Sequence, residues 1–435
     1  MQDMLEEIII EFHKEKLPEL FRRELIIPVD TDKVITIIGL RRVGKTHYLF
    51  QTIRDFIDKG LEKKGIFYIN FEDERLSNIS VNDLSGIVEL YYKLNPDAKM
   101  LYLFFDEIQV VDKWELFIRR LTEKKNVRIF LTGSSSKLLS REIATSLRGR
   151  TISFYLFPLS FTEFLRIKDF KLEYPLIESE RGRLQGYLED FIEYGGFPEL
   201  LEHDRMIRNR ILKEYLDLII YRDLIERYSI EKIPALKFLI QSLIRNFARE
   251  LSVLKLYNYL KSANISLGKS KAYEYFSYLE DINFIFVIKK YGKGFREVEG
   301  SIPKVYLTDL GFVTLYGMED KGRRIENLVA IELFRKKHYT NPLLEIYFWK
   351  DYSGLEVDFA IKEGLKIKQL IQVCYDIDDI TTRERELKAL VKASKQMECD
   401  NLLVITWDYE DKEQFRGKKI EFIPLWRWLL TPDVV

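Results

Sequence analysis

A glycine-rich stretch near the start of the chain constrains the fold more than any other feature. The apolar run at residues 34–38 has the length of a buried strand, residues 39–46 read GLRRVGKT, and a helical pattern follows. The stretch fits the pattern GxxxxGK[ST] in full, with the strand before it and the helix after it that the pattern requires. Backbone amides in such a loop, together with the helix N-terminus, bind phosphate. We therefore expect a phosphate-binding loop on a parallel α/β sheet.

Two pairs of side chains complete the expected nucleotide site. Lys45 should reach the β- and γ-phosphates of a nucleotide, and the Thr46 hydroxyl should ligate Mg²⁺. A second apolar run, LYLFFDEIQ, ends in Asp106 and Glu107. Asp106 would hold Mg²⁺ through water, and Glu107 would orient or deprotonate the attacking water. The adjacent carboxylates favour an ATPase of the extended-sheet class over a small GTPase, with ATP or ADP as ligand and Mg²⁺ as cofactor.

Polar residues further along the chain each have two interpretations. Thr132 or Ser134 either senses the γ-phosphate and holds the lytic water, or belongs to a turn that caps the next helix. Arg148 or Arg150 either acts as an arginine finger supplied by a neighbouring copy in a homo-oligomer, or lies in a solvated loop. The predicted catalytic residues are Glu107, Lys45, Arg148 and Arg150. The predicted nucleotide contacts are Gly39, Arg42, Val43, Gly44, Lys45, Thr46, His47, Asp106 and Thr132.

The pattern along the chain predicts a multidomain α/β protein. Strand-like runs at 34–38, 66–71, 101–105, 127–131 and 151–157 alternate with helical patterns, which is typical of a parallel sheet covered on both faces. We predict a P-loop domain at 1–157, a helical connector at 158–229, a winged-helix domain at 230–320 and a C-terminal α/β domain at 321–435.

Several further motifs carry a resemblance that covers nearly the whole chain. In order, GLRRVGKT, YINFEDERL, LYLFFDEIQ, FLTGSSSKLLS and SLRGRTISFYLFPLSFTEF resemble archaeal and bacterial AAA-type ATPases with a C-terminal domain of uncharacterised function. YGGFPEL, YRDLIERY, RRIENLVAIEL, YFWKDYSGLEVDFAI and LIQVCYDI fit as well. The resemblance implies the roles given above for Gly44, Lys45, Thr46, Asp106 and Glu107. It also implies that the acidic segment at 72–74 lies near the nucleotide.

The middle segment has the element order of a winged helix-turn-helix. Ser252 can cap one helix and Ser266 a second, in which Ala272, Tyr275, Phe276 and Leu279 form one buried stripe. The opposite side carries Lys269, Ser270, Tyr273 and Ser277, and runs at 284–289 and 304–308 form a hairpin with its tip at 291–294. Residues 232–296 hold twelve Lys and Arg against four Asp and Glu. This excess suits double-stranded DNA at residues 252–296; the alternative is a rigid module that binds protein.

The C-terminal segment follows the order of a restriction-endonuclease-like, PD-(D/E)xK fold. Glu326 falls on a helix, Asp358 on a strand and Gln372 on the next strand, the positions that bind metal and activate water in such nucleases. Cys374 stands where the lysine of the motif belongs, and Lys366 and Lys368 offer only a speculative substitute. We therefore expect a nuclease-like fold that has lost catalysis, with a buried Cys374.

Composition limits the remaining choices. The chain has 69 Lys and Arg against 69 Asp and Glu, two cysteines and no apolar run of membrane-spanning length. We expect a cytoplasmic protein without a membrane partner, and any DNA contact confined to the basic middle segment. Three hypotheses remain: an ATPase whose nucleotide state controls the winged helix, a slow ATP-dependent DNA-binding switch, and an ATP-gated nuclease.

Overall fold

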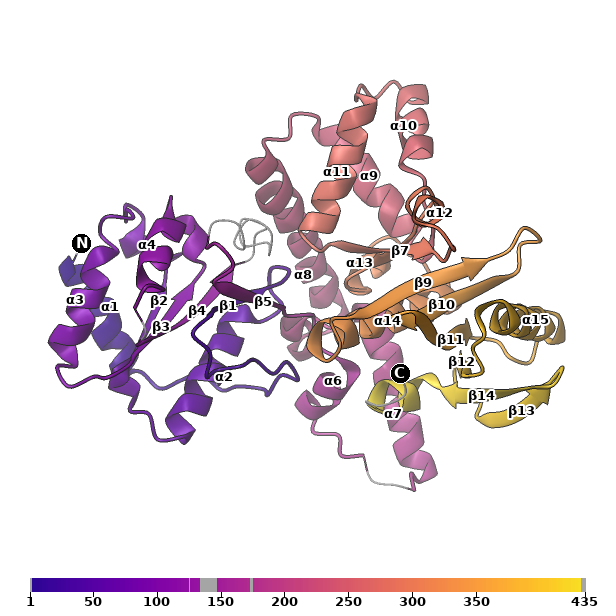
Figure 1. Cartoon of the computed structure of the whole chain (residues 1–435), viewed down its shortest axis with the longest axis horizontal. Coiled ribbons are helices and arrows are strands. Elements are labelled where there is room, and N and C mark those ends of the chain that lie inside the picture. Colours follow the sequence, from indigo (N-terminus) through magenta and orange to yellow (C-terminus); the bar gives the residue numbers. More distant parts are fainter. Residues whose placement is uncertain (1, 125, 134–146, 173–174, 432–435) are drawn as a thin grey trace. The chain divides into compact units, whose positions relative to one another are not determined.

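The chain folds into two compact units, Met1–Phe157 and Pro158–Val435, which we call unit 1 and unit 2 (Figure 1). The structure is a computed structural model that describes residues 2–124, 126–133, 147–172 and 175–431. Ser134, one of the two candidate γ-phosphate sensors, lies outside the described residues.

Unit 1 is built around a five-stranded parallel sheet with the order β2-β3-β4-β1-β5. Its strands are β1 (Val34–Ile38), β2 (Ile66–Asn70), β3 (Leu101–Asp106), β4 (Val127–Gly133) and β5 (Thr151–Tyr155). Its α-helices within the described residues are α1 (Gln2–Lys14), α2 (Lys45–Asp58), α3 (Ser85–Leu94) and α4 (Trp114–Leu121). Because β4 lies between β1 and β3, the sheet has the extended arrangement predicted from the paired carboxylates.

The register of this sheet brings the strand ends that precede Gly39, Glu107 and Ser134, and with them most of the predicted site residues, to one edge. Ile38, the last residue of β1, is aligned with Gly133 at the end of β4 and with Tyr155 at the end of β5. Asn70 at the end of β2 is aligned with Asp106 at the end of β3. Parallel strands carry their carboxyl ends on the same edge, so the last residues of β4 and the loops that follow β1 and β3 face a common space.

The first half of unit 2 is helical. Its α-helices are α6 (Phe161–Ile167), α7 (Glu178–Tyr194), α8 (Arg205–Leu218), α9 (Ile233–Arg245), α10 (Val253–Ser262) and α11 (Lys269–Asp281). A capping box formed by Ser160 and Glu163 begins α6, and a π-helical segment, η6 (Ile219–Glu226), continues α8. Buried leucine and isoleucine side chains of α9 face the core of this unit, which explains its strong amphipathic pattern.

The second half of unit 2 is a mixed sheet of nine strands, with the order β13-β14-β12-β11-β10-β9-β7-β8-β6. The strands are β6 (Arg249–Glu250), β7 (Ile285–Lys290), β8 (Lys304–Leu307), β9 (Leu344–Lys350), β10 (Glu356–Glu363), β11 (Lys366–Cys374), β12 (Leu402–Thr406), β13 (Asp411–Phe415) and β14 (Lys418–Pro424). The helices are α12 (Phe295–Glu299), α13 (Gly311–Thr314), α14 (Lys321–Tyr339), α15 (Ile380–Met397) and α16 (Leu425–Leu430).

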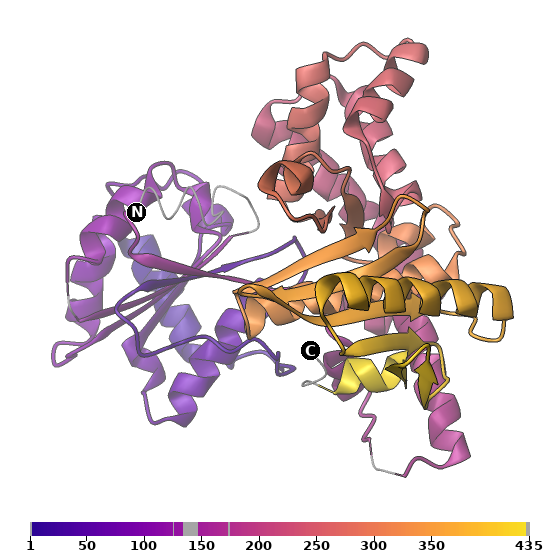
Figure 2. The ribbon, with the colours of Figure 1, turned by 45° about the vertical axis from the view of Figure 1, so that its right-hand side comes forward.

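Long helices cover this sheet. In Figure 2, α15 lies across the strands of the C-terminal part, and its buried Leu387 and Leu390 share one apolar cluster with Val357, Leu370 and Val404. The predicted strands and helices at 325–406 are present with small shifts in their ends. Strands β13 and β14 and helix α16 were not predicted, because their patterns are short and interrupted by polar residues.

The hairpin of the middle segment differs from the predicted wing. Strands β7 and β8 pair antiparallel as expected, but β7 also pairs parallel with β9, so the hairpin is part of the nine-stranded sheet. Helix α12 fills the connection, and its Glu297 and Glu299 contact Lys293 and Lys289. The charge count that ended at residue 296 missed these carboxylates, and the tip is therefore less basic than the sequence indicated.

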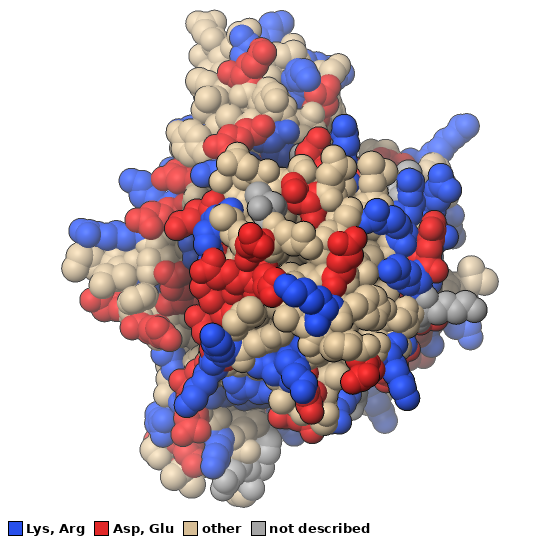
Figure 3. Space-filling model, turned by 90° about the vertical axis from the view of Figure 1, so that its left-hand side faces the viewer, with Lys and Arg blue, Asp and Glu red and all other residues tan. Residues whose placement is uncertain are grey.

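Charges of both signs are spread over the face of the molecule in Figure 3. Blue and red side chains alternate there, apart from one group of acidic side chains left of the centre. This mixture agrees with the equal numbers of basic and acidic residues in the chain. Among the helices of the described residues, none is both long and apolar enough to cross a membrane.

Candidate functional site

The glycines of the phosphate loop have backbone conformations that other residues adopt poorly. A Cβ atom on Gly39 would lie 2.4 Å from the carbonyl oxygen of Leu156, so only glycine lets the loop pass this strand end. Gly44 has φ +93° and forms the N-cap of α2. The loop therefore ends at the N-terminus of α2, whose first backbone amides point out of the helix, as phosphate binding requires.

Lys45 lies between the loop and the end of β3. Its ammonium donates to the carbonyl oxygens of Leu40 at 3.0 Å and Gly39 at 3.3 Å, and its side chain is buried. The same Nζ lies 3.9 Å from Oε1 of Glu107. Two predicted catalytic residues, separated by more than sixty positions in the chain, are thus neighbours.

Asp106 is held by hydroxyl groups from three elements. Thr132 of β4 donates to Oδ1, Tyr68 of β2 donates to Oδ2 at 3.0 Å, and the side chain of Thr46 also hydrogen-bonds to this carboxylate. Burial raises the pKa of Asp106, while these hydrogen bonds oppose the rise. Thr46 and Asp106, the two predicted Mg²⁺ ligands, therefore lie in contact.

Glu107 has an uncommon backbone conformation that directs its carboxylate toward Lys45. Its φ is +51°, in the left-handed region, and its amide donates to Oγ1 of Thr132 at 3.1 Å. Gln109 donates to Oε2 of the same carboxylate. Thr132 thus joins Asp106 to Glu107, which agrees with its predicted place in the site. Tyr68 and Gln109 were not predicted, because the resemblance assigns no role to either, although both lie in motifs that carry it.

The other predicted nucleotide contacts surround the loop. Val43 is fully buried and can offer only its backbone, whereas Arg42 has φ +67° and is exposed, as is His47 on α2. Arg41 forms an ion pair of 3.7 Å with Glu72 of the predicted acidic segment. Because glycines at 39 and 44 leave the loop without a Cβ at those two positions, and the Thr46 hydroxyl and the Asp106 carboxylate meet beside it, the residues present fit Mg²⁺ and ATP.

Arg148 and Arg150 lie at the opposite edge of the same sheet. Arg150 directly precedes β5, its carbonyl accepts from the amide of Val34, and its guanidinium donates to Thr122 at 3.0 Å. Val34 begins β1, whereas the phosphate loop follows the end of β1, about 16 Å away at ~3.3 Å per residue. Neither arginine belongs to the loop of its own chain in this arrangement, so a finger role requires a neighbouring copy. The finger and the alternative, a solvated loop, both stay predictions.

The two helices predicted to form a helix-turn-helix correspond to α10 and α11. Ser252 caps α10 by accepting from the amide of Lys255 at 3.3 Å, as predicted. The prediction for Ser266 was wrong, because α11 begins at Lys269 after Gly268, which provides no side-chain cap. The predicted stripe of α11 is buried and the predicted opposite side is exposed: Ala272, Tyr275, Phe276 and Leu279 against Lys269, Ser270, Tyr273 and Ser277.

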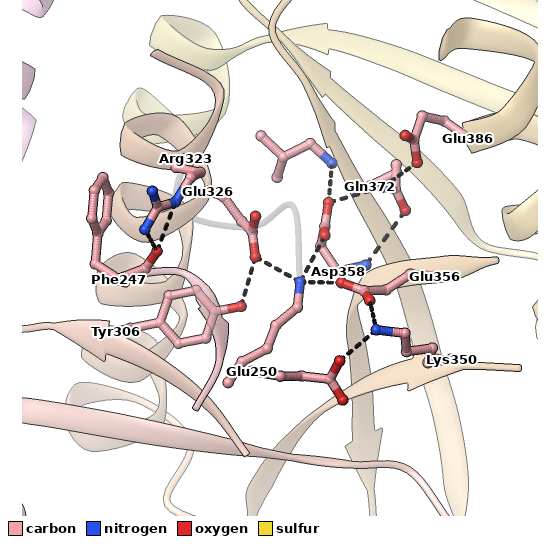
Figure 4. A network of polar contacts seen from close by, with 12 residues as sticks. Phe247, Glu250, Tyr306, Arg323, Glu326, Lys350, Glu356, Asp358, Gln372 and Glu386 are labelled. Carbon is pink, nitrogen blue, oxygen red and sulfur yellow. Dashed lines mark hydrogen bonds and ion pairs between the residues drawn. The ribbon is translucent and has the colours of Figure 1, made fainter. Parts of the chain in front are cut away.

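The three nuclease-like residues of the C-terminal segment also converge (Figure 4). Gln372 donates to Oδ2 of Asp358 at 2.9 Å, and Glu326 joins the same cluster through Lys304. Lys304 was not predicted, because it lies on β8, 54 positions before Asp358. Lys368 instead forms an ion pair with Glu363. Cys374 is buried as expected, and burial raises the pKa of its thiol to about 12.

Comparison with known proteins agrees with this site. Residues 31–165 match the family model of an AAA domain, and two domains of unknown function, DUF8612 and DUF4143, match residues 185–321 and 321–428. Unit 1 is therefore a P-loop domain of the AAA type, which belongs to the nucleotide-binding, ATPase class of domains. The chain is 40% identical to the uncharacterized protein MJ1544 of Methanocaldococcus jannaschii, over 98% of this chain and 95% of that protein, and it belongs to the same family.

More distant similarities extend over most of the chain. An uncharacterized protein of Haemophilus influenzae is 28% identical, over 95% of this chain and 98% of its own length. Among solved structures, the ORC1 protein of Aeropyrum pernix in complex with DNA covers 77% of this chain and 92% of its own, at 13% identity and a TM-score of 0.29. That structural similarity is too low to support an inference about this chain.

Proposed function

We propose that this protein binds and hydrolyses ATP in the presence of Mg²⁺ and uses its nucleotide state to control DNA binding by α10 and α11. The ATPase part rests on one observation. At the carboxyl edge of the sheet, contacts connect four residues in a row: Lys45, Glu107, Thr132 and Asp106. This arrangement places a cation, two carboxylates and a hydroxyl beside a loop that binds phosphate.

Each residue then has a chemical role. Lys45 exchanges its loop carbonyls for the β- and γ-phosphate oxygens of ATP, and Thr46 and Asp106 hold Mg²⁺. When bound, Mg²⁺ neutralises charge on the phosphate oxygens. Glu107 accepts a hydrogen bond from the attacking water and orients or deprotonates it, while Thr132 holds Glu107 and Asp106 in register.

Nucleotide binding and hydrolysis can be separated by three variants. We expect Lys45→Ala to lose binding of a fluorescent ATP analogue, and Glu107→Gln to bind it but to hydrolyse ATP at least ~100-fold more slowly, as for loss of a general base. Asp112→Asn, an exposed acidic residue shortly after the same strand, is the matched control and should behave as wild type. Turnover by Glu107→Gln equal to wild type would remove the catalytic assignment.

The DNA part of the proposal is supported by the exposed face of α10 and α11. Lys255, Lys261 and Lys269 are exposed on these two helices, and Tyr259 of α10 is 63% exposed. Lys271 contributes less positive charge, because it pairs with Glu274 at 2.6 Å. Exposed cations and an exposed aromatic ring on the same pair of helices suit contacts to phosphates and bases.

DNA binding is tested by titrating a labelled duplex against salt, with ATP and without nucleotide. We expect affinity to fall as salt rises, to differ between the two states, and to weaken in Lys269→Ala but not in Lys59→Ala, an exposed lysine of unit 1. Affinity that ignores salt and Lys269 would instead favour a module that binds protein.

A further inference from the structure

A buried lysine, Lys304, pairs with the three carboxylates of Glu326, Glu356 and Asp358, which are labelled in Figure 4. The Nζ atom of Lys304 lies 2.8 Å from Glu326, 2.6 Å from Glu356 and 3.1 Å from Asp358. These carboxylates come from α14 and β10, whereas the lysine comes from β8. An ammonium group has three protons, so the three carboxylates use its full donor capacity.

The remaining oxygens of Asp358 are also satisfied by protein groups. Its Oδ2 accepts from Nε2 of Gln372 at 2.9 Å and from the amide of Val373 at 3.0 Å. Asp358 lies at a β-bulge, where two residues of β10 between Val357 and Ala360 are opposite a single residue of β9. Such a bulge redirects a side chain. Both oxygens of the central carboxylate therefore have donors.

The surrounding groups extend the network on each side. Tyr306 donates to Glu326 at 2.8 Å, and Lys350 pairs with the second oxygen of Glu356 at 3.0 Å. Gln372 also donates to Glu386 at 2.5 Å. Within the part of the chain that the structure describes, no cluster of His, Cys, Asp and Glu has the arrangement of a metal site.

Burial and charge keep the lysine in place. Lys304 is 3% exposed and Asp358 is 6% exposed. Burial lowers the pKa of Lys304, but the attraction of Glu326, followed by Tyr306, Asp358 and Glu356, outweighs it and holds the pKa well above its usual value. A charged ammonium is thus fixed where its three carboxylate neighbours would otherwise face one another.

A divalent ion does not fit this arrangement. Mg²⁺ needs oxygen ligands at about 2.0–2.1 Å and keeps several waters, whereas the centre of this cluster is filled by an ammonium that repels a second cation. The order Glu326, Asp358, Gln372 implies a metal-dependent nuclease, but the side chains present contradict that implication.

We infer that Lys304 is a built-in cation that replaces a divalent metal in this cluster, so that the C-terminal α/β part joins β8 to β10 and α14 and does not cleave phosphodiesters. This inference goes beyond the proposed function and does not depend on it. It also explains why the middle hairpin and the C-terminal strands form one sheet, since a cation from the former neutralises anions from the latter.

The inference is tested by Mn²⁺ binding, measured by electron paramagnetic resonance on the full-length protein without nucleotide. Wild type and Asp358→Asn should bind the same amount of Mn²⁺, because the cluster takes up none. Lys304→Met should gain one Mn²⁺ per chain, and the double variant Lys304→Met, Asp358→Asn should lose it again. Lys304→Arg, which keeps the charge, should gain none.

Each outcome of these measurements either supports or overturns the inference about Lys304. Mn²⁺ binding or plasmid cleavage by wild type that disappears in Asp358→Asn overturns the inference, as does a folded Lys304→Met protein without a new site. Circular dichroism reports whether that variant folds. If it does not fold, the comparison of wild type with Asp358→Asn still decides, because Mn²⁺ binding common to both supports the inference and any difference between them contradicts it.

Discussion

The guanidinium of Arg23 donates to the carbonyl oxygen of Val43 at 2.8 Å, so a residue far outside the phosphate loop holds the loop backbone. Its other terminal nitrogen donates to the carbonyl of Phe157 at 2.7 Å, and its amide donates to Gln51 of α2 at 2.8 Å. Arg23 is buried and thereby links the loop to the last residue of unit 1.

Replacing Arg23 with alanine should weaken nucleotide binding. Two hydrogen bonds from a charged donor are lost and two carbonyls are left buried, at a cost of about 1–3 kcal/mol, or roughly five- to 150-fold in affinity. Titration of a fluorescent ATP analogue measures this loss. Arg22→Ala is the matched control, because Arg22 is exposed and pairs with Asp55 at 3.6 Å. Equal affinities of the two variants would show that the loop holds its shape without Arg23.

Thr132→Val should slow hydrolysis more than it weakens binding. The hydroxyl of Thr132 donates to Asp106 and accepts from the amide of Glu107, and valine of nearly the same shape provides neither bond. We expect kcat to fall about tenfold or more while the dissociation constant of ATP changes little. Thr132→Ser restores the hydroxyl and should recover activity. If Thr132→Ser and Thr132→Val were equally slow, the methyl packing and not the hydroxyl would be responsible.

The arginines that precede β5 should act only between copies of the chain. Arg148→Ala and Arg150→Ala are each compared with wild type over a range of protein concentrations, and we expect at least one variant to lose about 10³-fold in kcat. Mixing that variant with Lys45→Ala should restore part of the activity, because each supplies what the other lacks. Arg128→Ala, which breaks a pair with Asp32 near the same edge, is the control. Activity independent of concentration, with both variants as fast as wild type, would contradict a finger.

The buried Asp309 predicts a specific pH dependence of stability. Its carboxylate accepts from the amides of Gly196 at 2.7 Å and Gly311 at 2.8 Å, and burial raises its pKa to about 7. The folded protein therefore keeps a proton between pH ~4 and ~7 that the unfolded chain releases. The contribution of this group to the free energy of unfolding is present below pH ~4 and is lost as the pH rises through about 7.

This contribution can be isolated with Asp309→Asn, which has nearly the same shape and does not titrate. The free energy of unfolding of wild type minus that of the variant, from urea titrations, should fall by up to roughly 4 kcal/mol between pH 4.5 and 8. The exposed Asp112→Asn serves as the control. A difference that stays constant over this range would mean that Asp309 is ionised throughout.

The nucleotide site was predictable because its signals are local. A strand, a glycine-rich turn and a helix lie next to one another in the chain, and the acidic pair ends an apolar run, so Lys45, Thr46, Asp106 and Glu107 could be assigned directly. Tyr68 and Arg23 could not, because each takes part through a contact between elements that are distant in sequence, and Gln109 could not, because its contact with Glu107 depends on the local backbone conformation. The edge of the sheet on which Arg150 lies could not be predicted either, because it depends on the order of the strands.

The amphipathic stripe of α11 could also be predicted from the periodicity of its apolar residues. The capping role of Ser266 could not be predicted reliably, because a cap depends on the residue at which the helix begins. The C-terminal cluster shows the difference most clearly. Glu326, Asp358 and Gln372 could be selected from their order on a helix and two strands, and Cys374 stands where the lysine of the motif would lie. The loss of nuclease catalysis stays a prediction. Only the tertiary structure shows that a cation is nevertheless present. The pairing of β7 with β9 brings Lys304, from another segment of the chain, into this buried site. Carboxylates without a cation would be unstable there.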